Sequence, residues 1–96
     1  MDGEFITQLT AHQSRLLAYI RSLTAGVHYA DEVLQRTNLV LWEKREQFEP
    51  GSNFGAWACR VAYFEVLAWR KQQQRERARL EFDDELLERI ADRTPE

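Results

Sequence analysis

Apolar residues recur at spacings of three and four along most of the chain, which indicates helices that each bury one face. The first such run extends from Phe5 to Leu23 and consists of Phe5, Leu9, Leu16, Leu17, Ile20 and Leu23. Thr24 to His28, with Gly26, predicts a break. A second helix is expected from Tyr29 to about Phe48. Its predicted core face consists of Ala30, Val33, Leu34, Thr37, Val40 and Leu41.

The second half of the chain begins with a predicted turn, Glu49 to Asn53, in which Ser52 or Asn53 is a suitable N-cap. Phe54 to about Arg79 lacks proline and is expected to form one long helix, or a short helix feeding a longer one. Its apolar stripe is Trp57, Val61, Phe64 and Ala68. A last short helix is expected from Asp83 to Ala91, capped by Asp83 or Asp84, with Leu86, Leu87 and Ile90 apolar.

These elements predict an all-α fold, a small antiparallel helical bundle of three main helices plus a short C-terminal helix. Residues 1–80 form the expected helical domain, and residues 81–96 form an acidic segment after it. A chain of 96 residues, 44% hydrophobic and 30% charged, fits one small globular domain.

Composition also narrows the cellular setting. The only cysteine, Cys59, excludes an internal disulfide framework and suits a reducing compartment. No apolar run approaches the roughly 20 residues that span a bilayer, and no signal peptide is visible. We expect a soluble, cytoplasmic protein.

Charge is unevenly distributed along this acidic chain. The formal net charge is -3, yet residues 60–79 carry six basic residues against Glu65 and Glu76, a local charge of +4. Aromatic residues precede the cations: Phe48, Phe54, Trp57, Tyr63, Phe64 and Trp69 come before Arg70, Lys71, Arg75, Arg77 and Arg79. Single-stranded nucleic acid binds to such combinations, because bases stack on rings and phosphates pair with cations.

Each of these features has a simpler structural explanation. Trp57, Val61 and Phe64 at helical spacing also fit a buried stripe. Tyr63 and Trp69 fall off that stripe, so exposure is expected for them. The cations from Arg70 onward also fit a solvated helix end.

The second helix has a further face that carries Leu39 and Trp42 beside Glu32, Gln35, Arg36 and Glu43. Trp and Arg are enriched at binding hot spots, so this face is a candidate partner site. The alternative is that Trp42 only covers the edge of the bundle.

Catalysis has little support. His12 and His28 have no metal-ligand spacing, Cys59 has no acid–base partner that the sequence places beside it, and no Gly-rich phosphate loop occurs. We expect neither an enzyme, nor a cofactor, nor a metal site.

Two stretches resemble the second conserved region of bacterial RNA polymerase sigma factors of the small extracytoplasmic-function (ECF) class. One is Ala30-Asp31-Glu32-Val33-Leu34-Gln35-Arg36-Thr37 with Leu39-Val40-Leu41-Trp42. The other is Phe48-x-Pro50-Gly51-x-x-Phe54-x-Ala56-Trp57-x-x-x-Val61-Ala62, followed by Arg70-Lys71. The resemblance extends from about Phe5 to Arg79.

This resemblance implies a promoter-recognition domain that binds core RNA polymerase and captures melted minus-ten promoter DNA to initiate transcription. The second helix would dock on the clamp coiled coil of the largest polymerase subunit. The polymerase-binding candidates are then Glu32, Gln35, Arg36, Leu39, Trp42 and Glu43. Factors of this class often have an anti-sigma protein as a further partner.

In the same family the turn at 49–53 captures a flipped-out base, and the following helix holds single-stranded promoter DNA. The DNA-binding candidates are Asn53, Phe54, Trp57, Arg60, Tyr63, Phe64, Trp69, Arg70, Lys71 and Arg75. The chain departs from the family pattern at four positions: the family usually has an acid at Arg36, Phe at Asn38, Asn at Phe64 and Asp at Ala68. The promoter sequence that this chain recognises therefore cannot be inferred from the family.

The chain stops where a full ECF factor continues into a second DNA-binding domain. We therefore expect an isolated first domain with the beginning of the interdomain linker after it. The acidic residues of that segment are expected to shield the basic helix end before DNA arrives. The competing interpretation is a small helical protein–protein interaction module without DNA binding, whose site is the Trp42 face.

Overall fold

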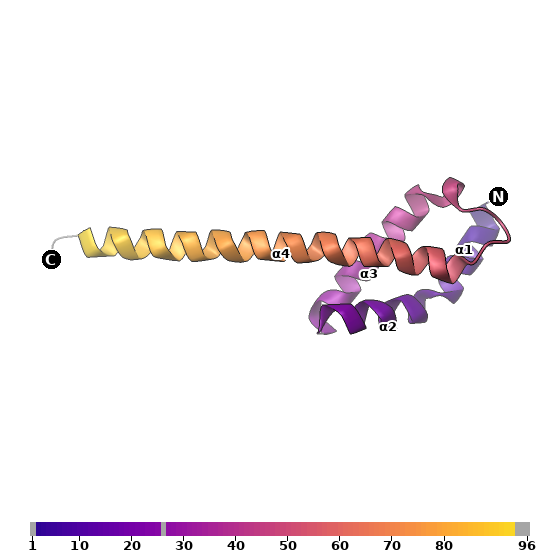
Figure 1. Cartoon of the computed structure of the whole chain (residues 1–96), viewed down its shortest axis with the longest axis horizontal. Helices are drawn as coiled ribbons and strands as arrows, with labels where there is room; N and C mark the ends of the chain where they lie inside the picture. The colour runs from indigo at the N-terminus through magenta and orange to yellow at the C-terminus, as the bar shows by residue number, and fades with distance from the viewer. Residues whose placement is uncertain (1, 26, 94–96) are drawn as a thin grey trace.

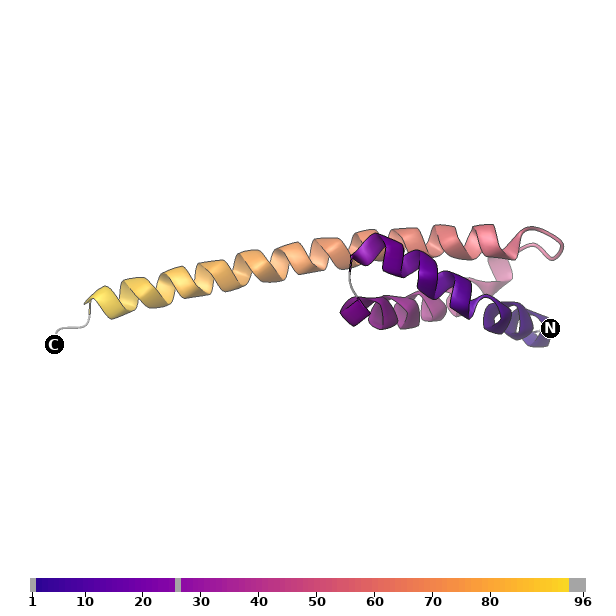
Figure 2. The same ribbon diagram turned by 90° about the horizontal axis from the view of Figure 1, so that it is seen from below.

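The computed structural model describes residues 2–25 and 27–93, which contain helices and connecting turns but no strand. The helices are α1 (Asp2–Ala11), α2 (Gln13–Thr24), α3 (Val27–Glu43), a 3₁₀ turn η1 (Arg45–Gln47) and α4 (Phe54–Arg93). The first half of α4 packs with α2 and α3, while its second half projects away from the bundle (Figures 1 and 2). The predicted all-α helical bundle is confirmed.

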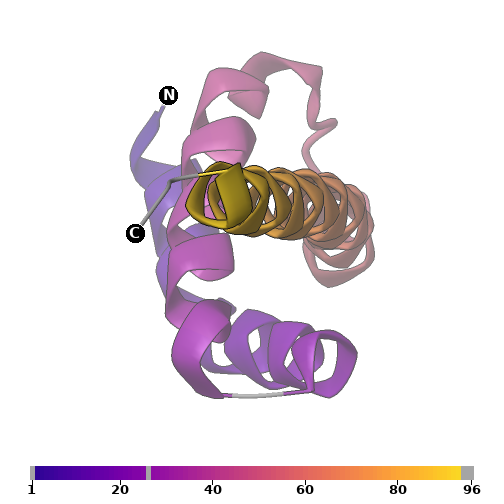
Figure 3. The same cartoon turned by 90° about the vertical axis from the view of Figure 1, so that its left-hand side faces the viewer.

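The core lies where α2, α3 and the first half of α4 meet, and α1 covers its end next to the 48–54 turn (Figure 3). Its buried apolar residues are Phe5, Leu16, Ile20, Ala30, Val33, Leu41, Phe54, Ala58, Ala62, Val66 and Trp69. The core face predicted for the second helix is confirmed, since Ala30, Val33, Thr37 and Leu41 are fully buried. Thr37 stays satisfied there because its hydroxyl donates to the Val33 carbonyl at 2.8 Å.

The buried apolar stripe predicted for α4 is wrong, because the buried face is rotated by part of a helical turn from the predicted one. Phe64 and Ala68 are exposed, and the buried stripe is instead Phe54, Ala58, Ala62, Val66 and Trp69. Ala58 and Ala62 have no accessible surface, so two small side chains lie in the middle of the face that α4 packs against the bundle. Small side chains let helices pack closely, with the rings of Phe54 and Trp69 buried at the two ends of this stripe and that of Phe64 outside it.

The first predicted helix is divided in two at His12. The His12 ring Nδ1 bonds the Gln8 carbonyl at 2.7 Å, and Gln13 Nε2 donates to the Leu9 carbonyl at 3.1 Å. Side chains thus satisfy carbonyls at the end of α1. Gln13 and Asn38 also exchange two amide hydrogen bonds of 2.8 Å, which attach the start of α2 to α3. The break is a tertiary effect that hydrophobic spacing does not reveal.

The two predicted connections occur, but the break is shorter than Thr24–His28, and α3 ends at Glu43 instead of near Phe48, with η1 following it. α2 ends at Thr24, and Ala25 adopts the left-handed conformation with φ 50°; Gly26 lies outside the described residues. In the 49–53 turn Gly51 has φ 91°, a conformation that costs glycine little. Asn53 is the N-cap of α4, because its Oδ1 accepts a hydrogen bond of 3.0 Å from the Ala56 N–H.

The separate short helix at 83–91 is wrong. These residues are helical, but they continue α4, which runs for 40 residues. The sequence from Ala56 to Thr94 contains neither glycine nor proline, so nothing local forces a break at Asp83 or Asp84. The molecule is elongated as a result, with principal extents of 71 × 23 × 17 Å.

Candidate functional site

The side of α4 that faces away from the core gathers rings and cations. Arg60, Phe64, Lys71 and Arg75 are spaced by four, seven and four residues, which keeps them on one side of the helix, and all four are exposed. Tyr63 flanks this row with its ring 5.7 Å from that of Phe64 in an edge-to-face arrangement. Tyr63 is 42% exposed and Phe64 55% exposed, so both rings are open to a stacking partner.

Two of the rings predicted to contact DNA are instead in the core. Phe54 is 3% exposed and packs edge-on against Phe5 and Phe48 at 5.5 and 5.3 Å. Trp69 is 8% exposed and lies 5.0 Å from the Tyr29 ring. The expected exposure of Trp69 is therefore wrong, and neither ring has a face available for a base. Both lie on the side of α4 that the Ala58–Ala62 contact turns inward.

Trp57 has an intermediate environment. Its ring packs against Phe48 at 5.1 Å and against Phe54 at 5.7 Å, so it belongs partly to the core. It also lines a shallow groove of about 340 Å³ between α3 and α4. The other residues of that groove are Val40, Lys44, Gln47, Arg60, Val61, Phe64 and Glu65. The core and the groove share this ring, so Trp57 is partly buried, and its contact with DNA stays a prediction.

A pocket of about 480 Å³ lies beside the turn that precedes α4. Phe48, Pro50, Gly51 and Ser52 supply one wall, and the opposite wall belongs to α1 and η1. Those further residues are Asp2, Glu4, Phe5, Gln8, Arg45 and Glu46. Arg45 donates to Asp2 Oδ1 at 3.1 Å and so joins η1 to α1 within that wall. The pocket combines an aromatic ring with donors and acceptors, which is what recognition of an unpaired base requires.

The basic row continues past the bundle edge. Arg70 donates to the Leu23 carbonyl at the end of α2, which fixes it against the bundle. Phe64, Leu67, Ala68, Arg70, Lys71 and Gln74 line a second shallow groove, of about 510 Å³. Asn53, the remaining DNA-binding candidate, is exposed at the start of α4 and is engaged as its N-cap.

The acidic segment does not fold over the basic one. Because α4 is continuous, the acidic residues lie further along the same rod. Lys71 and Asp84 are 13 residues apart, or roughly 20 Å at 1.5 Å per residue. That distance is about twice the Debye length at 0.1 M salt. Arg70 and Lys71 are therefore far from Asp84, whereas Arg79 lies only two residues from Glu81 and four from Asp83 on the same helix, so shielding of the basic helix end stays a prediction.

The six polymerase-binding candidates occupy the face of α3 opposite its buried stripe. Leu39 is 65% exposed and Trp42 is 36% exposed. Trp42 also packs on Phe5 at 6.2 Å, and the Arg45 guanidinium lies 4.1 Å from its ring centre. Trp42 therefore both covers the bundle edge and presents a surface. Gln35 and Glu43 are exposed on the same face.

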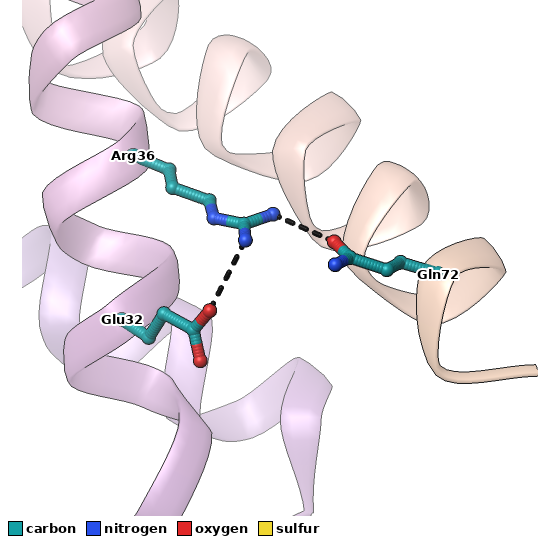
Figure 4. Close-up of polar contacts among 3 residues, drawn as sticks. All are labelled: Glu32, Arg36 and Gln72. Atoms are coloured by element: carbon teal, nitrogen blue, oxygen red, sulfur yellow. Dashed lines mark hydrogen bonds and ion pairs between the residues drawn. The ribbon is translucent and has the colours of Figure 1, made fainter. Parts of the chain in front are cut away.

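Arg36 connects this face to α4. One guanidinium nitrogen donates to Glu32 Oε1 at 3.1 Å and another donates to Gln72 Oε1 at 3.0 Å, as Figure 4 shows. Arg36 replaces an acid that the family pattern has at this position, and in this chain it links α3 to the point where α4 leaves the bundle.

The sequence analysis did not identify Arg45. This residue contacts Trp42 through its cation, bonds Asp2 and the Trp42 carbonyl, and lines the pocket beside the turn. Arg45 follows Trp42 by three residues, and this spacing could have predicted their contact, because residues i and i+3 of a helical turn are neighbours.

Within residues 2–25 and 27–93 no cluster of His, Cys, Asp and Glu is suited to hold a metal ion. A search of those residues also finds no helix with the length and apolar character that crossing a bilayer requires.

Comparison with protein-family models identifies a family for this chain. A family model described as Sigma-70 region 2 matches residues 9–76, which include α2, α3 and α4 as far as the basic residues. Neither the curated proteins nor the solved structures gave a significant match.

Proposed function

The chain belongs to the Sigma-70 region 2 family, and from this premise we propose that it is the promoter-recognition domain of an ECF sigma factor. Its general role is that of a sigma-factor promoter-recognition domain, with core RNA polymerase and promoter DNA as partners. The family is one of non-enzymatic transcription-factor domains. The ECF class is supported by the two motifs around Leu34 and Trp57 and is part of the proposal.

The observation that carries the DNA role is the solvent face of α4. Exposed rings at Tyr63 and Phe64 stand in one row with Arg60, Lys71 and Arg75. An unpaired base that has lost its neighbours regains stacking on such rings, at about 1–3 kcal/mol per base. The cations pair with phosphates along the same row. Melted non-template DNA would therefore lie along the first half of α4.

The pocket beside the turn extends this path. It begins at Phe48 and the 50–52 backbone, next to the N-terminus of α4. A base turned out of the strand at this end would enter the pocket, stack on an aromatic wall and meet the Arg45–Asp2 pair. The family resemblance assigns base capture to this same turn.

The polymerase would dock on the opposite side, on the outer face of α3. Leu39 and Trp42 supply apolar surface there, and Glu32, Gln35 and Glu43 supply polar groups around it. Exposed Trp with neighbouring polar residues is typical of a binding hot spot. Because the two surfaces are on different helices, each can be altered without the other.

A pair of substitutions tests this division. Leu39→Ala with Trp42→Ala should weaken co-purification with bacterial core polymerase, and Leu39→Ala alone, which keeps the Trp42–Arg45 contact, should do so without changing affinity for a single-stranded minus-ten oligonucleotide. Phe64→Ala should do the reverse, with a DNA dissociation constant raised about 5- to 100-fold. Thermal unfolding controls for loss of fold, and Ile6→Ala, another exposed apolar residue, is the matched control.

The outcomes separate the candidate functions. If Phe64→Ala and a variant lacking the exposed cations both keep full DNA affinity, the DNA role fails and the α3 face remains as a protein-interaction site. If Leu39→Ala with Trp42→Ala keeps full polymerase binding, docking through α3 fails instead.

A further inference from the structure

The part of α4 beyond the bundle carries large apolar side chains in solvent. We call residues 74–92 the α4 extension; all of them are exposed. Leu80, Phe82, Leu86 and Leu87 are 58%, 62%, 45% and 62% exposed. An isolated helix of this length is marginally stable in water. Burial of these side chains would therefore stabilise it.

The apolar side chains share one side of the extension. At 100° per residue, Leu80, Phe82, Leu86 and Leu87 fall within an arc of about 160°. Most carboxylates occupy the other side, namely Glu81, Asp84, Glu85, Glu88 and Asp92. Asp83 is an exception, because it falls inside the apolar arc. Arg75 and Arg79 continue the same arc toward the bundle. The α4 extension is therefore an amphipathic helix whose apolar face also carries charged residues of both signs.

Charge along the rod is arranged in two blocks. Residues 70–79 contain five cations and Glu76, a net charge of +4. Residues 81–92 contain six carboxylates and Arg89, a net charge of -5. Two such rods laid antiparallel place each basic block beside an acidic block. Laid parallel, they place like charges together.

We propose that the α4 extension pairs antiparallel with the α4 extension of a second copy of this chain, about a two-fold axis near Glu81. Leu80 then lies opposite Phe82 of the second copy, and Phe82 lies opposite Leu80 of that copy. Arg79 likewise lies opposite Asp83 of the second copy, and the pair occurs twice because the contact is symmetric. Apolar burial supplies the attraction, and the two charge pairs fix the orientation.

The dimensions of the rod allow this contact. The 12 residues that follow the axis, 82–93, are about 18 Å long. That length extends along the other copy as far as the edge of its bundle, where α4 emerges (Figure 2). The two bundles then lie at opposite ends of the paired helices and do not compete for space. The dimer forms without polymerase or DNA, but its basic block includes Arg75, which the proposed function assigns to DNA, so bound promoter DNA is expected to compete with the dimer.

Sedimentation equilibrium of the 96-residue chain tests the proposal. We expect a monomer–dimer equilibrium that weakens between about 0.05 M and about 0.5 M salt, because screening affects the charge pairs. Arg79→Asp and Asp83→Arg should each raise the dissociation constant about tenfold or more. The double variant, with both charges reversed, should return it to within about threefold of the original.

Matched controls identify the face. Glu88→Arg makes the same charge change as Asp83→Arg, but about 140° away around the helix, and should not weaken the dimer. Phe82→Ser should abolish the dimer without a loss of helical signal from the bundle. Cysteines at positions 79 and 83, in a chain with Cys59→Ser, should form disulfides between copies, because antiparallel pairing places these two positions of the apolar face opposite each other.

Three results would overturn the proposal. One is a chain that stays monomeric up to about 1 mM, a concentration at which even weak specific dimers form. Another is a dimer whose dissociation constant is unaffected by either single charge reversal. The third is an extension that gains hydrogen-exchange protection only when promoter DNA or polymerase is added, which would assign the apolar face to that partner.

Discussion

Phe64 and Trp69 lie on the same helix and have opposite environments. Phe64 is 55% exposed and Trp69 is 8% exposed, although both are large rings at positions that a helical pattern allows to be buried. The rotation of α4 about its own axis determines which of the two rings is buried. The contact at Ala58 and Ala62 sets that rotation. The proposed DNA recognition and the stability of the bundle therefore depend on different rings of one helix.

Asn53 illustrates a side chain with a well-defined structural contribution. Its Oδ1 accepts the Ala56 N–H at 3.0 Å, which satisfies one of the N–H groups that lack a partner at the start of α4. Asn53→Ala should therefore lower the free energy of unfolding by about 1 kcal/mol, measured by urea denaturation.

Asn53→Asp is the control for the cap, because a carboxylate accepts the same hydrogen bond and is favourable at a helix N-terminus. An Ala variant as stable as the original chain would mean that water replaces the cap at no cost.

α3 and α4 each divide their surface between a buried stripe and an outward face. On α3 the outward face combines Leu39 and Trp42 with polar groups, and on α4 it combines Phe64 with cations. Arg36 bonds to Gln72 across the two helices and so fixes how the faces are oriented relative to each other. Two helices with one shared core can thus present two distinct binding surfaces.

The cations at the bundle edge should control the salt dependence of DNA binding. Arg70→Ala with Lys71→Ala should weaken binding to a single-stranded promoter oligonucleotide. The slope of log K against log salt concentration should fall by about 1.4 to 2 units, since each phosphate contact releases counterions. A salt titration by fluorescence anisotropy measures both quantities.

Arg89→Ala, a cation within the acidic block, is the matched control and should leave the slope unchanged. Lys71→Ala alone separates charge from structure, because Arg70 also bonds the Leu23 carbonyl. An unchanged slope in the double variant would remove these cations from the DNA path.

The molecule as a whole consists of a compact bundle and a rod. Described core residues end at Trp69, and residues 74–92 are all exposed, so folding of the bundle receives little from the second half of α4. The rod projects from the bundle (Figure 1) and so carries the acidic block and the exposed apolar side chains away from it.

Deletion of residues 82–96 should therefore leave the thermal midpoint of the bundle unchanged, measured by circular dichroism at a concentration where the chain is monomeric. Trp69→Ala should instead lower the free energy of unfolding by about 3–5 kcal/mol, because it removes a buried ring. A deletion that destabilises the bundle as much as Trp69→Ala would show that the rod contributes to the core.

Local chemistry was sufficient to predict much of this fold. The core faces of α2 and α3, the break after Thr24, the turn at Gly51 and the Asn53 cap all follow from spacing, glycine and capping preferences that act within a few residues. The residues around Leu34 and Trp57 were sufficient to indicate the family that the comparison shows. The roles of individual site residues stay predictions.

Contacts between distant segments decided the rest. Gln13 meets Asn38 of α3 beside the break at His12, and the close approach of α2 and α3 to Ala58 and Ala62 turned Phe54 and Trp69 inward and Phe64 outward. The pocket beside the turn joins α1 to η1 through Asp2 and Arg45, 43 residues apart. The spacing of apolar residues within one helix indicates that one face is buried. Which of several overlapping faces is buried depends on the helix that packs closest, and only the tertiary structure shows that helix.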